Sequence, residues 1–95
     1  MPLGLSYLNL HLPGSHSLKD KRSRLKPLLA RLHKEFNISI VEYDRLDSWQ
    51  QAELGFAMIC NDSRLLQPAH TTILDFIRSH FPDIQVSDES FEIID

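Results

Sequence analysis

The apolar residues of this chain change their spacing near residue 15, and this change constrains the fold more than any other feature. Residues 3–12 alternate, which places Leu8, Leu10 and Leu12 on one face of an extended segment. From residue 17 to residue 36 the apolar residues follow a helical period instead and form a single stripe. The pattern predicts a strand with one buried face, followed directly by an amphipathic helix.

The rest of the chain repeats these two patterns. The further elements expected are strands over 38–43 and 52–60, a helix opened by the cap 61–63 and ended by Pro82, and a strand over 84–86 that continues through 91–94 after an acidic break. Pro27 lies inside the first helical stripe, which continues in phase on both sides, so we expect a kink there. A bulge is also expected in the second strand, after Ile40.

The order β-α-β-β-α-β predicts an α+β fold, a ferredoxin-like sandwich of four antiparallel strands with both helices on one face. We expect a single domain over residues 1–95. In this arrangement we expect the first and third strands to be parallel neighbours, with their carboxyl ends side by side. That placement brings segment 15–22 next to Asn61, and it puts the hairpin that carries Trp49 at the opposite edge.

Segment 11–22 carries most of the unusual chemistry of the chain. Pro13 and Gly14 end the strand, Ser17 is placed to cap the helix, and Asp20 follows in the position of a capping box. Free amides at a helix start, with cations around them, are the composition of an anion site. The residues expected to bind are His11, Ser15, His16, Ser17, Lys19, Lys21, Arg22 and Asn61. The alternative is an ordinary solvated helix start, and Lys21 also borders the apolar stripe.

Charge limits what such a site can bind. The formal net charge of −3 argues against a general polyanion binder, because nonspecific affinity for nucleic acid scales with the phosphates that a protein neutralises. The positive charge is nevertheless concentrated in residues 19–34, while the C-terminal third is acidic. We therefore expect any RNA binding to be local, and nothing indicates sequence-specific recognition of DNA.

The sequence lacks several features that would indicate secretion, a membrane span or a metal site. The single cysteine, Cys60, excludes an internal disulfide and fits a reducing compartment. No basic N-terminal region precedes a long apolar run, and no stretch reaches the ~20 apolar residues of a membrane span. Of the histidines only His11 and His16 can converge, near Asp62, and no metal-ligand spacing supports them. We expect a cytoplasmic protein that is not an enzyme, has no membrane contact, and holds neither a metal nor another cofactor.

A family resemblance extends over nearly the whole chain. The segments that carry it are Leu10–Arg22, Phe36–Ser39, Glu42–Asp44, Asp47–Gln50 and Asn61–Asp62, and the first contains the pattern H-x-P-G-x-x-S-L-K-x-K-R. In these segments the chain resembles the YlxP-like family of small uncharacterised bacterial proteins. The resemblance implies a ferredoxin-like fold, no established activity and, in many bacteria, a gene neighbourhood shared with transcription and translation factors.

A weaker resemblance is to the RNA-recognition motif, which has the same order of elements and stacks bases on aromatic residues of its first and third strands. Segment Gly55–Ile59 is similar to the third strand of that motif, and Tyr7 supplies an aromatic residue on the first strand. Tyr7 and Asn9 are therefore candidates on the sheet face that no helix covers. The alternative for Phe56 and Met58 is that they pack in the core.

Two classes of function follow from these observations. The first is an RNA- or ribosome-associated accessory protein that binds the phosphate backbone at segment 15–22. The second is a protein-interaction module that forms a homodimer or a hetero-complex through its uncovered sheet face or an edge strand. Salt separates the two, because phosphate binding weakens steeply with salt whereas burial of apolar surface does not.

Overall fold

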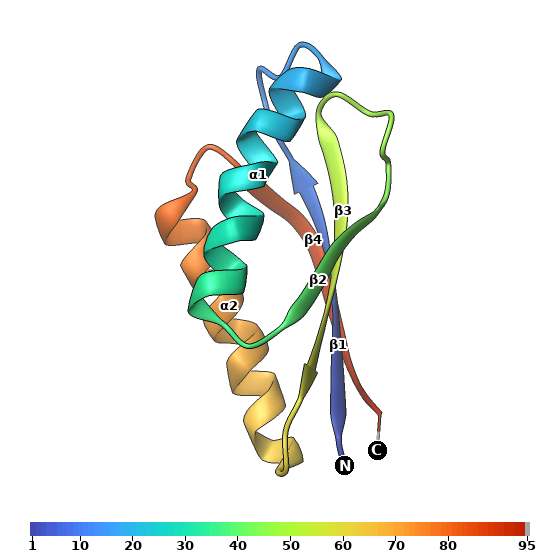
Figure 1. Ribbon diagram of the computed structural model, residues 1–95, viewed down its shortest axis with the longest axis vertical. Helices are drawn as coiled ribbons and strands as arrows, with labels where there is room; N and C mark the ends of the chain where they lie inside the picture. The colour runs from blue at the N-terminus through green and yellow to red at the C-terminus, as the bar shows by residue number, and fades with distance from the viewer. Residues whose placement is uncertain (95) are drawn as a thin grey trace.

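The computed structural model describes residues 1–94, and its elements follow the predicted order (Figure 1). They are β1 (Leu3–His11), α1 (Leu18–Glu35), β2 (Ser39–Asp44), β3 (Gln51–Ile59), the short 3-10 helix η1 (Ser63–Leu65), α2 (Leu66–His80) and β4 (Gln85–Ile94). The predicted ferredoxin-like α+β sandwich is confirmed. Of the domain predicted over residues 1–95, Asp95 lies outside the described residues.

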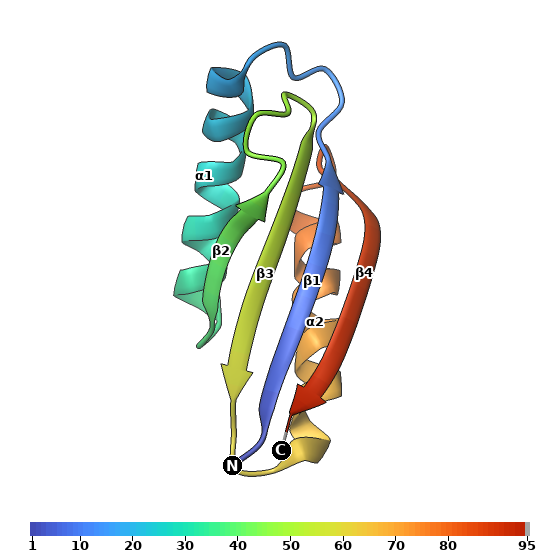
Figure 2. The same cartoon turned by 90° about the vertical axis from the view of Figure 1, so that its right-hand side faces the viewer.

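The four strands form one antiparallel sheet in the order β2-β3-β1-β4, and both helices lie on the same side of it (Figure 2). β1 pairs with β3 from Leu3 opposite Ile59 to His11 opposite Gln51. The prediction that the first and third strands are parallel is therefore wrong. Helix α1 returns the chain so that β2 is parallel to β1, and the β2–β3 hairpin then reverses it, so β3 must run opposite to β1.

This strand direction decides which loops meet. The β1–α1 loop lies beside the β2–β3 hairpin, where the Leu12 amide donates to the Gln50 carbonyl at 2.9 Å and the Gln50 side chain donates to the Ser15 carbonyl at 3.2 Å. Trp49 therefore lies at the same end of the molecule as the β1–α1 loop. The carboxyl end of β3 lies at the other end of the sheet (Figure 2), opposite the start of β1, and Asn61 follows it in the chain. The predicted positions of Trp49 and Asn61 relative to that loop are both wrong.

The core lies between the helices and the sheet face that they cover. Leu8, Leu10 and Leu12 are buried there, as their alternation predicts. Phe56 and Met58 of β3 belong to the same core and are only 2% and 6% exposed. Each fully buried Leu, Phe or Met stabilises a fold by ~1.5–3 kcal/mol, so these positions decide which sheet face turns inward. Phe56 and Met58 are therefore not available to stack bases.

Helix α1 is continuous from Leu18 to Glu35 and includes Pro27. Ser17 caps it as predicted, because its hydroxyl accepts from the Asp20 amide at 3.0 Å. Pro27 lies on the exposed side, and the helix continues past it. Neither α1 nor α2 has the length and apolarity that crossing a bilayer requires, and the same holds for every helix within residues 1–94.

We call the side of the sheet that no helix covers the open face. From β1 it carries Leu3, Leu5, Tyr7, Asn9 and His11, and cross-strand partners from β3 and β4 flank each of them. The expected bulge in β2 falls at Tyr43 rather than after Ile40. A second bulge at Ser87 replaces the predicted acidic break, so β4 is continuous.

Candidate functional site

The predicted anion site begins at the capped start of α1. The Asp20 carboxylate accepts a hydrogen bond from the His16 amide at 3.1 Å, while the Asp20 amide donates to Ser17. A carboxylate here interacts favourably with the positive end of the helix, as a bound phosphate would. The chain thus supplies its own anion at the place where an external anion is expected.

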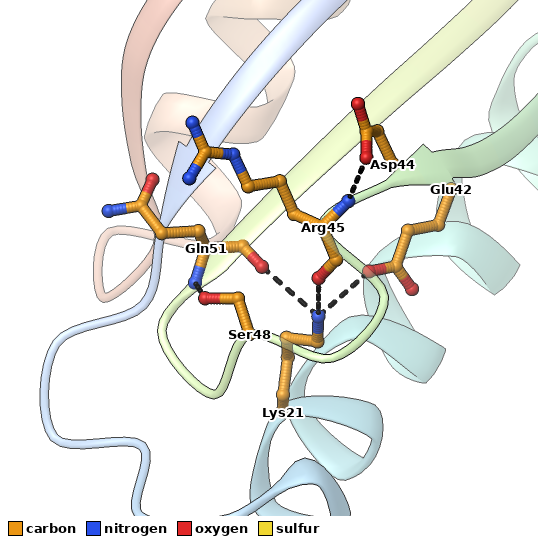
Figure 3. Close-up of polar contacts among 6 residues, drawn as sticks. All are labelled: Lys21, Glu42, Asp44, Arg45, Ser48 and Gln51. Carbon is orange, nitrogen blue, oxygen red and sulfur yellow. Dashed lines mark hydrogen bonds and ion pairs between the residues drawn. The ribbon is translucent and has the colours of Figure 1, made fainter.

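Lys21 is a buried structural residue, only 1% exposed, and its contacts are drawn in Figure 3. Its ammonium group donates to the Glu42 carboxylate at 2.9 Å, the Arg45 carbonyl at 2.8 Å and the Gln51 carbonyl at 3.0 Å. An ammonium group has three donors, so all of them are used. Lys21 joins α1 to the β2–β3 hairpin and is not placed to bind phosphate as predicted.

The other predicted residues do not form one site. Those exposed at the start of α1 are His16, Lys19 and Arg22. Ser15 is buried in the preceding loop. His11 lies beside the hairpin, where its Nδ1 donates to the Gln50 carbonyl at 3.2 Å. Asn61 is exposed at the opposite end of the sheet, so it shares no site with the helix start.

The half of the open face nearest the start of β1 exposes apolar side chains. The apolar side chains here, which we call the apolar half, are Leu3, Leu5, Ala57, Ile59 and Ile94, with Val41 at the border in the row of Tyr7. Two polar residues, Ser39 and Glu92, complete the row of Leu5. Ile59 is 64% exposed, Val41 57% and Ile94 46%. A hollow of about 330 Å³ lies at the β2 border of this half, lined in part by Leu3, Ala57 and Ile59. Several exposed apolar side chains grouped on one sheet face are typical of a binding surface.

The other half of the open face contains a polar hollow of about 150 Å³, which we call the acidic hollow. A row of three cross-strand partners, Glu53, Asn9 and Asp88, lines it from three adjacent strands. The rings of Tyr7 and Tyr43 line it as well, and they meet edge to face with centroids 6.0 Å apart. Tyr7 and Asn9 lie on the uncovered sheet face, as their alternation predicts, with Tyr7 exposed and Asn9 half-buried.

The acidic hollow is rich in hydrogen-bond acceptors. The Oδ1 atom of Asn9 is buried and has no hydrogen-bond partner among residues 1–94. Asp88 accepts one bond, from the Glu89 amide at 2.9 Å. In the described part of the chain, neither Glu53 nor Asp88 takes part in an ion pair. The hollow therefore presents unpaired carboxylates to the solvent and contains a buried acceptor that has no donor.

The strands carry no cation that compensates this charge. None of the residues of β1, β2, β3 or β4 is a lysine or an arginine. Desolvation raises the pKa of Tyr43 above its ordinary value, and the carboxylates of Glu53 and Asp44 raise it further. This half of the open face can attract a positively charged group and repels phosphate.

A second polar cluster, which no sequence motif indicates, lies in the core. The Ser6 hydroxyl and Nδ1 of His70 form a hydrogen bond of 2.7 Å, and Nε2 of His70 donates to the Glu89 carboxylate. The order Ser6, His70, Glu89 resembles that of nucleophile, base and acid in hydrolases. However, Ser6 and His70 are only 1% and 2% exposed, and His70 packs against the rings of Phe56 and Phe91. A hydroxyl without exposed surface cannot reach a substrate, so this cluster joins α2 to the sheet.

Comparisons with known proteins agree on a family and a fold. A sequence family described as "Protein of unknown function (DUF503)" matches residues 3–90. The "Uncharacterized protein YlxP" of Bacillus subtilis (strain 168) is 38% identical over 69 residues, which cover 73% of this chain and 74% of that protein. The de novo designed protein Foldit4 has a similar structure, with a TM-score of 0.54 and 10% sequence identity. The match covers 100% of this chain and 98% of the chain of Foldit4. That last similarity concerns the fold alone.

Proposed function

The chain belongs to the DUF503 family, and we propose that it acts as a protein-interaction module that binds a protein partner through the open face of its sheet. The family match confirms the resemblance to YlxP-like proteins, whose function is unknown. One observation carries the proposal: the open face combines exposed apolar side chains with strands that contain no lysine or arginine.

The apolar half supplies the driving force for such binding. Val41 and Ile59 are each more than half exposed, and they lie on the neighbouring strands β2 and β3. Covering apolar surface yields roughly 25 cal/mol per Å², and this term is insensitive to salt. A protein surface with complementary apolar side chains would gain this free energy, whereas a phosphate backbone would not.

The face is better suited to docking than the edge of the sheet. Both edge strands contain a bulge and acidic residues: in β4 these are the bulge at Ser87 and Asp88, Glu89 and Glu92, and in β2 the bulge at Tyr43 and Glu42 and Asp44. Bulges and charges on an edge strand oppose pairing with a further strand. We therefore place the partner on the open face.

The RNA hypothesis loses most of its support at the predicted site. Lys21 is fully engaged inside the protein, and Asp20 already occupies the start of α1. The exposed cations that remain there include Lys19 and Arg22. RNA binding at these two residues is the competing outcome that the experiment below must distinguish.

The test begins with a photo-crosslinking amino acid in place of Val41 and, in a matched control, in place of Leu65. Leu65 is 55% exposed but lies in η1, outside the open face. We expect a discrete protein adduct from position 41 in the cells of the protein's own host and none from position 65. Adducts to RNA, or equal adducts from both positions, would overturn the proposal.

The second step uses the purified partner and purified protein. The double variant Val41→Ser/Ile59→Ser should weaken the complex by at least ~10-fold, because two partly exposed aliphatic side chains lose their burial. The control variant Leu46→Ser/Leu65→Ser removes two equally exposed apolar side chains from elsewhere and should change the affinity less than ~2-fold. If both variants weaken the complex equally, the open face is not the binding surface.

A further inference from the structure

We infer that the acidic hollow receives a cationic side chain of the partner, arginine in preference to lysine. This inference rests on the proposed function, because it names the chemistry of the protein that covers the open face. The partner segment would combine apolar side chains, which cover the apolar half, with a positive charge that enters the acidic hollow.

The shape of the hollow fits one side chain. Its volume of about 150 Å³ is below the ~300–1,000 Å³ of pockets that hold small-molecule ligands or cofactors. Glu53, Asn9 and Asp88 lie on adjacent strands, which are ~4.8 Å apart, so the two carboxylates flank the Asn9 amide on either side. A group that enters between them meets acceptors on both sides.

The unused acceptors indicate what kind of group this is. The buried Oδ1 of Asn9 lacks a donor, and neither carboxylate is paired with a cation within residues 1–94. Buried polar atoms in native proteins are normally hydrogen-bonded, so an orphan acceptor at a surface hollow points to a donor from outside. A guanidinium group has five donors in a plane and no acceptor, which suits a site of this composition.

The aromatic rings give an independent indication of a cation. Tyr7 and Tyr43 meet edge to face beside the carboxylates, and the Tyr43 ring lies over Gly55. Gly55 has no side chain, so the ring can approach the sheet closely. Electron-rich ring faces attract ammonium and guanidinium groups, and the attraction increases when the cation is desolvated.

No cation of this chain fills the hollow in the described residues. Arg45 follows β2, but it does not line the hollow and forms an ion pair with neither Glu53 nor Asp88. His11 occupies the next cross-strand position along β1, where its Nδ1 donates to the Gln50 carbonyl. The positive charge must therefore come from another molecule.

Charge also disfavours a second copy of the chain as the molecule that covers the open face. Two open faces packed against each other would bring together the acidic residues of both copies, which are Asp44, Glu53, Asp88 and Glu92 in each. The strands offer no lysine or arginine to offset them. Like charges at an interface are unfavourable, so complementarity favours a basic partner over self-association.

The first experiment uses small probes and needs no partner. An amide-resolved NMR titration compares N-acetyl-arginine amide with N-acetyl-citrulline amide, which has nearly the same shape but no charge, and with N-acetyl-lysine amide. We expect salt-sensitive shifts of residues 7, 9, 43, 53 and 88 with the arginine probe, weaker ones with lysine, and at least ~10-fold weaker binding of citrulline. Equal shifts with arginine and citrulline would overturn the inference.

The variant Glu53→Gln/Asp88→Asn should reduce binding of the arginine probe at least ~10-fold. Its matched control is Glu35→Gln/Asp75→Asn, which removes the same number of exposed carboxylates from the two helices. If both variants bind the probe equally, attraction by the overall charge explains the binding and the inference fails.

The purified partner complex separates this inference from the proposed function. If Val41→Ser/Ile59→Ser weakens the complex but Glu53→Gln/Asp88→Asn does not, the proposed function stands and the cationic side chain does not. If the arginine probe binds in the acidic hollow while the apolar substitutions leave the complex unchanged, the hollow is a cation site and the proposed function fails. Weakening by both variants, with salt dependence lost only in the second, supports both.

Discussion

Two clusters of hydrogen-bond acceptors lie on opposite sides of the same sheet, and they differ in where the positive charge comes from. On the helix side, the Glu42 carboxylate and the carbonyls of Arg45 and Gln51 surround the ammonium group of Lys21. On the open side, the acidic hollow has carboxylates and a buried amide oxygen, but none of the residues 1–94 supplies a cation to it. The first cluster is built to serve stability, and the second is the place where we propose that a partner binds.

The Lys21 cluster also fixes the shape of the hairpin. Arg45 has a φ of 60°, which is uncommon for a residue other than glycine, and its carbonyl is one of the three acceptors. The side chains of Lys21 and Glu42 are 2% and 18% exposed, so solvent screens this ion pair little. Removing the Lys21 ammonium group should therefore leave the Glu42 carboxylate without a counter-charge.

The largest effect is expected for Lys21→Met. Loss of the ammonium group leaves the largely buried Glu42 carboxylate unpaired and takes one donor from each of two carbonyls, of which the Arg45 carbonyl keeps the Ser48 amide. The free energy of unfolding should therefore fall by ~2–4 kcal/mol in urea denaturation. The control is Lys26→Met, an exposed lysine of the same helix, which should change it by less than ~0.5 kcal/mol. A loss below ~1 kcal/mol for Lys21→Met would mean that the cluster does not serve stability.

The next effect is the coupling between Lys21 and Glu42. A double-mutant cycle with Lys21→Met and Glu42→Leu should give an interaction free energy of ~1–2 kcal/mol, because the second substitution removes the unpaired carboxylate. The same cycle on Arg31 and Glu35, an exposed pair 3.6 Å apart, should give at most ~0.5 kcal/mol. Equal couplings in the two cycles would contradict a special role for the buried pair.

The acidic hollow should respond in the opposite way. Glu53→Gln/Asp88→Asn removes two unpaired carboxylates, so the free energy of unfolding at low salt should stay within ~0.5 kcal/mol of the original value or rise slightly. Chemical denaturation at low and high salt measures this. A loss above ~1 kcal/mol would show that these carboxylates hold the fold together, as Lys21 does on the other side.

The smallest effect concerns the ionisation of Tyr43. Desolvation raises its pKa, and Glu53 is the largest of the charges that raise it further. Glu53→Gln should therefore lower the pKa of Tyr43 toward its ordinary value without reaching it, in an alkaline titration followed by NMR of the ring carbons. Glu35→Gln on α1 should leave the pKa of Tyr43 unchanged, and an unchanged value in Glu53→Gln would place that carboxylate away from the ring.

The sequence predicts the features that depend on local order. The alternation of Leu8, Leu10 and Leu12 identifies the buried face of β1, and Ser17 identifies the start of α1. The face of Tyr7 and Asn9 follows from the same alternation. Each of these rests on neighbours in the chain, which a sequence displays directly.

The features that depend on pairing between distant segments are not predicted. Strand direction places Asn61 far from the helix start, and the bulges at Tyr43 and Ser87 set which side chains share a row. Glu53 and Asp88 meet at Asn9 only through this register. No local sequence pattern specifies how two strands pair, so the acidic hollow could not be predicted from the sequence.

Two buried polar residues are missed for a different reason. Ser6 shares the alternation of Leu8 and Leu10, and His70 lies one helical turn after Leu66. Both positions therefore face the core. Serine and histidine are polar and are commonly exposed, but the positions of Ser6 and His70 in the hydrophobic pattern indicate burial. When the two disagree, a buried hydrogen-bond partner should be sought, as Ser6 and His70 provide for each other.

The strand order has a consequence for synthesis of the chain on the ribosome. β1 is made first and occupies the centre of the sheet, but both of its neighbours, β3 and β4, are made later. Until β4 emerges, one edge of this leucine-rich strand has no partner, and unpaired strand edges favour aggregation. A nascent chain stalled between β3 and β4 would therefore still need a chaperone to protect that edge.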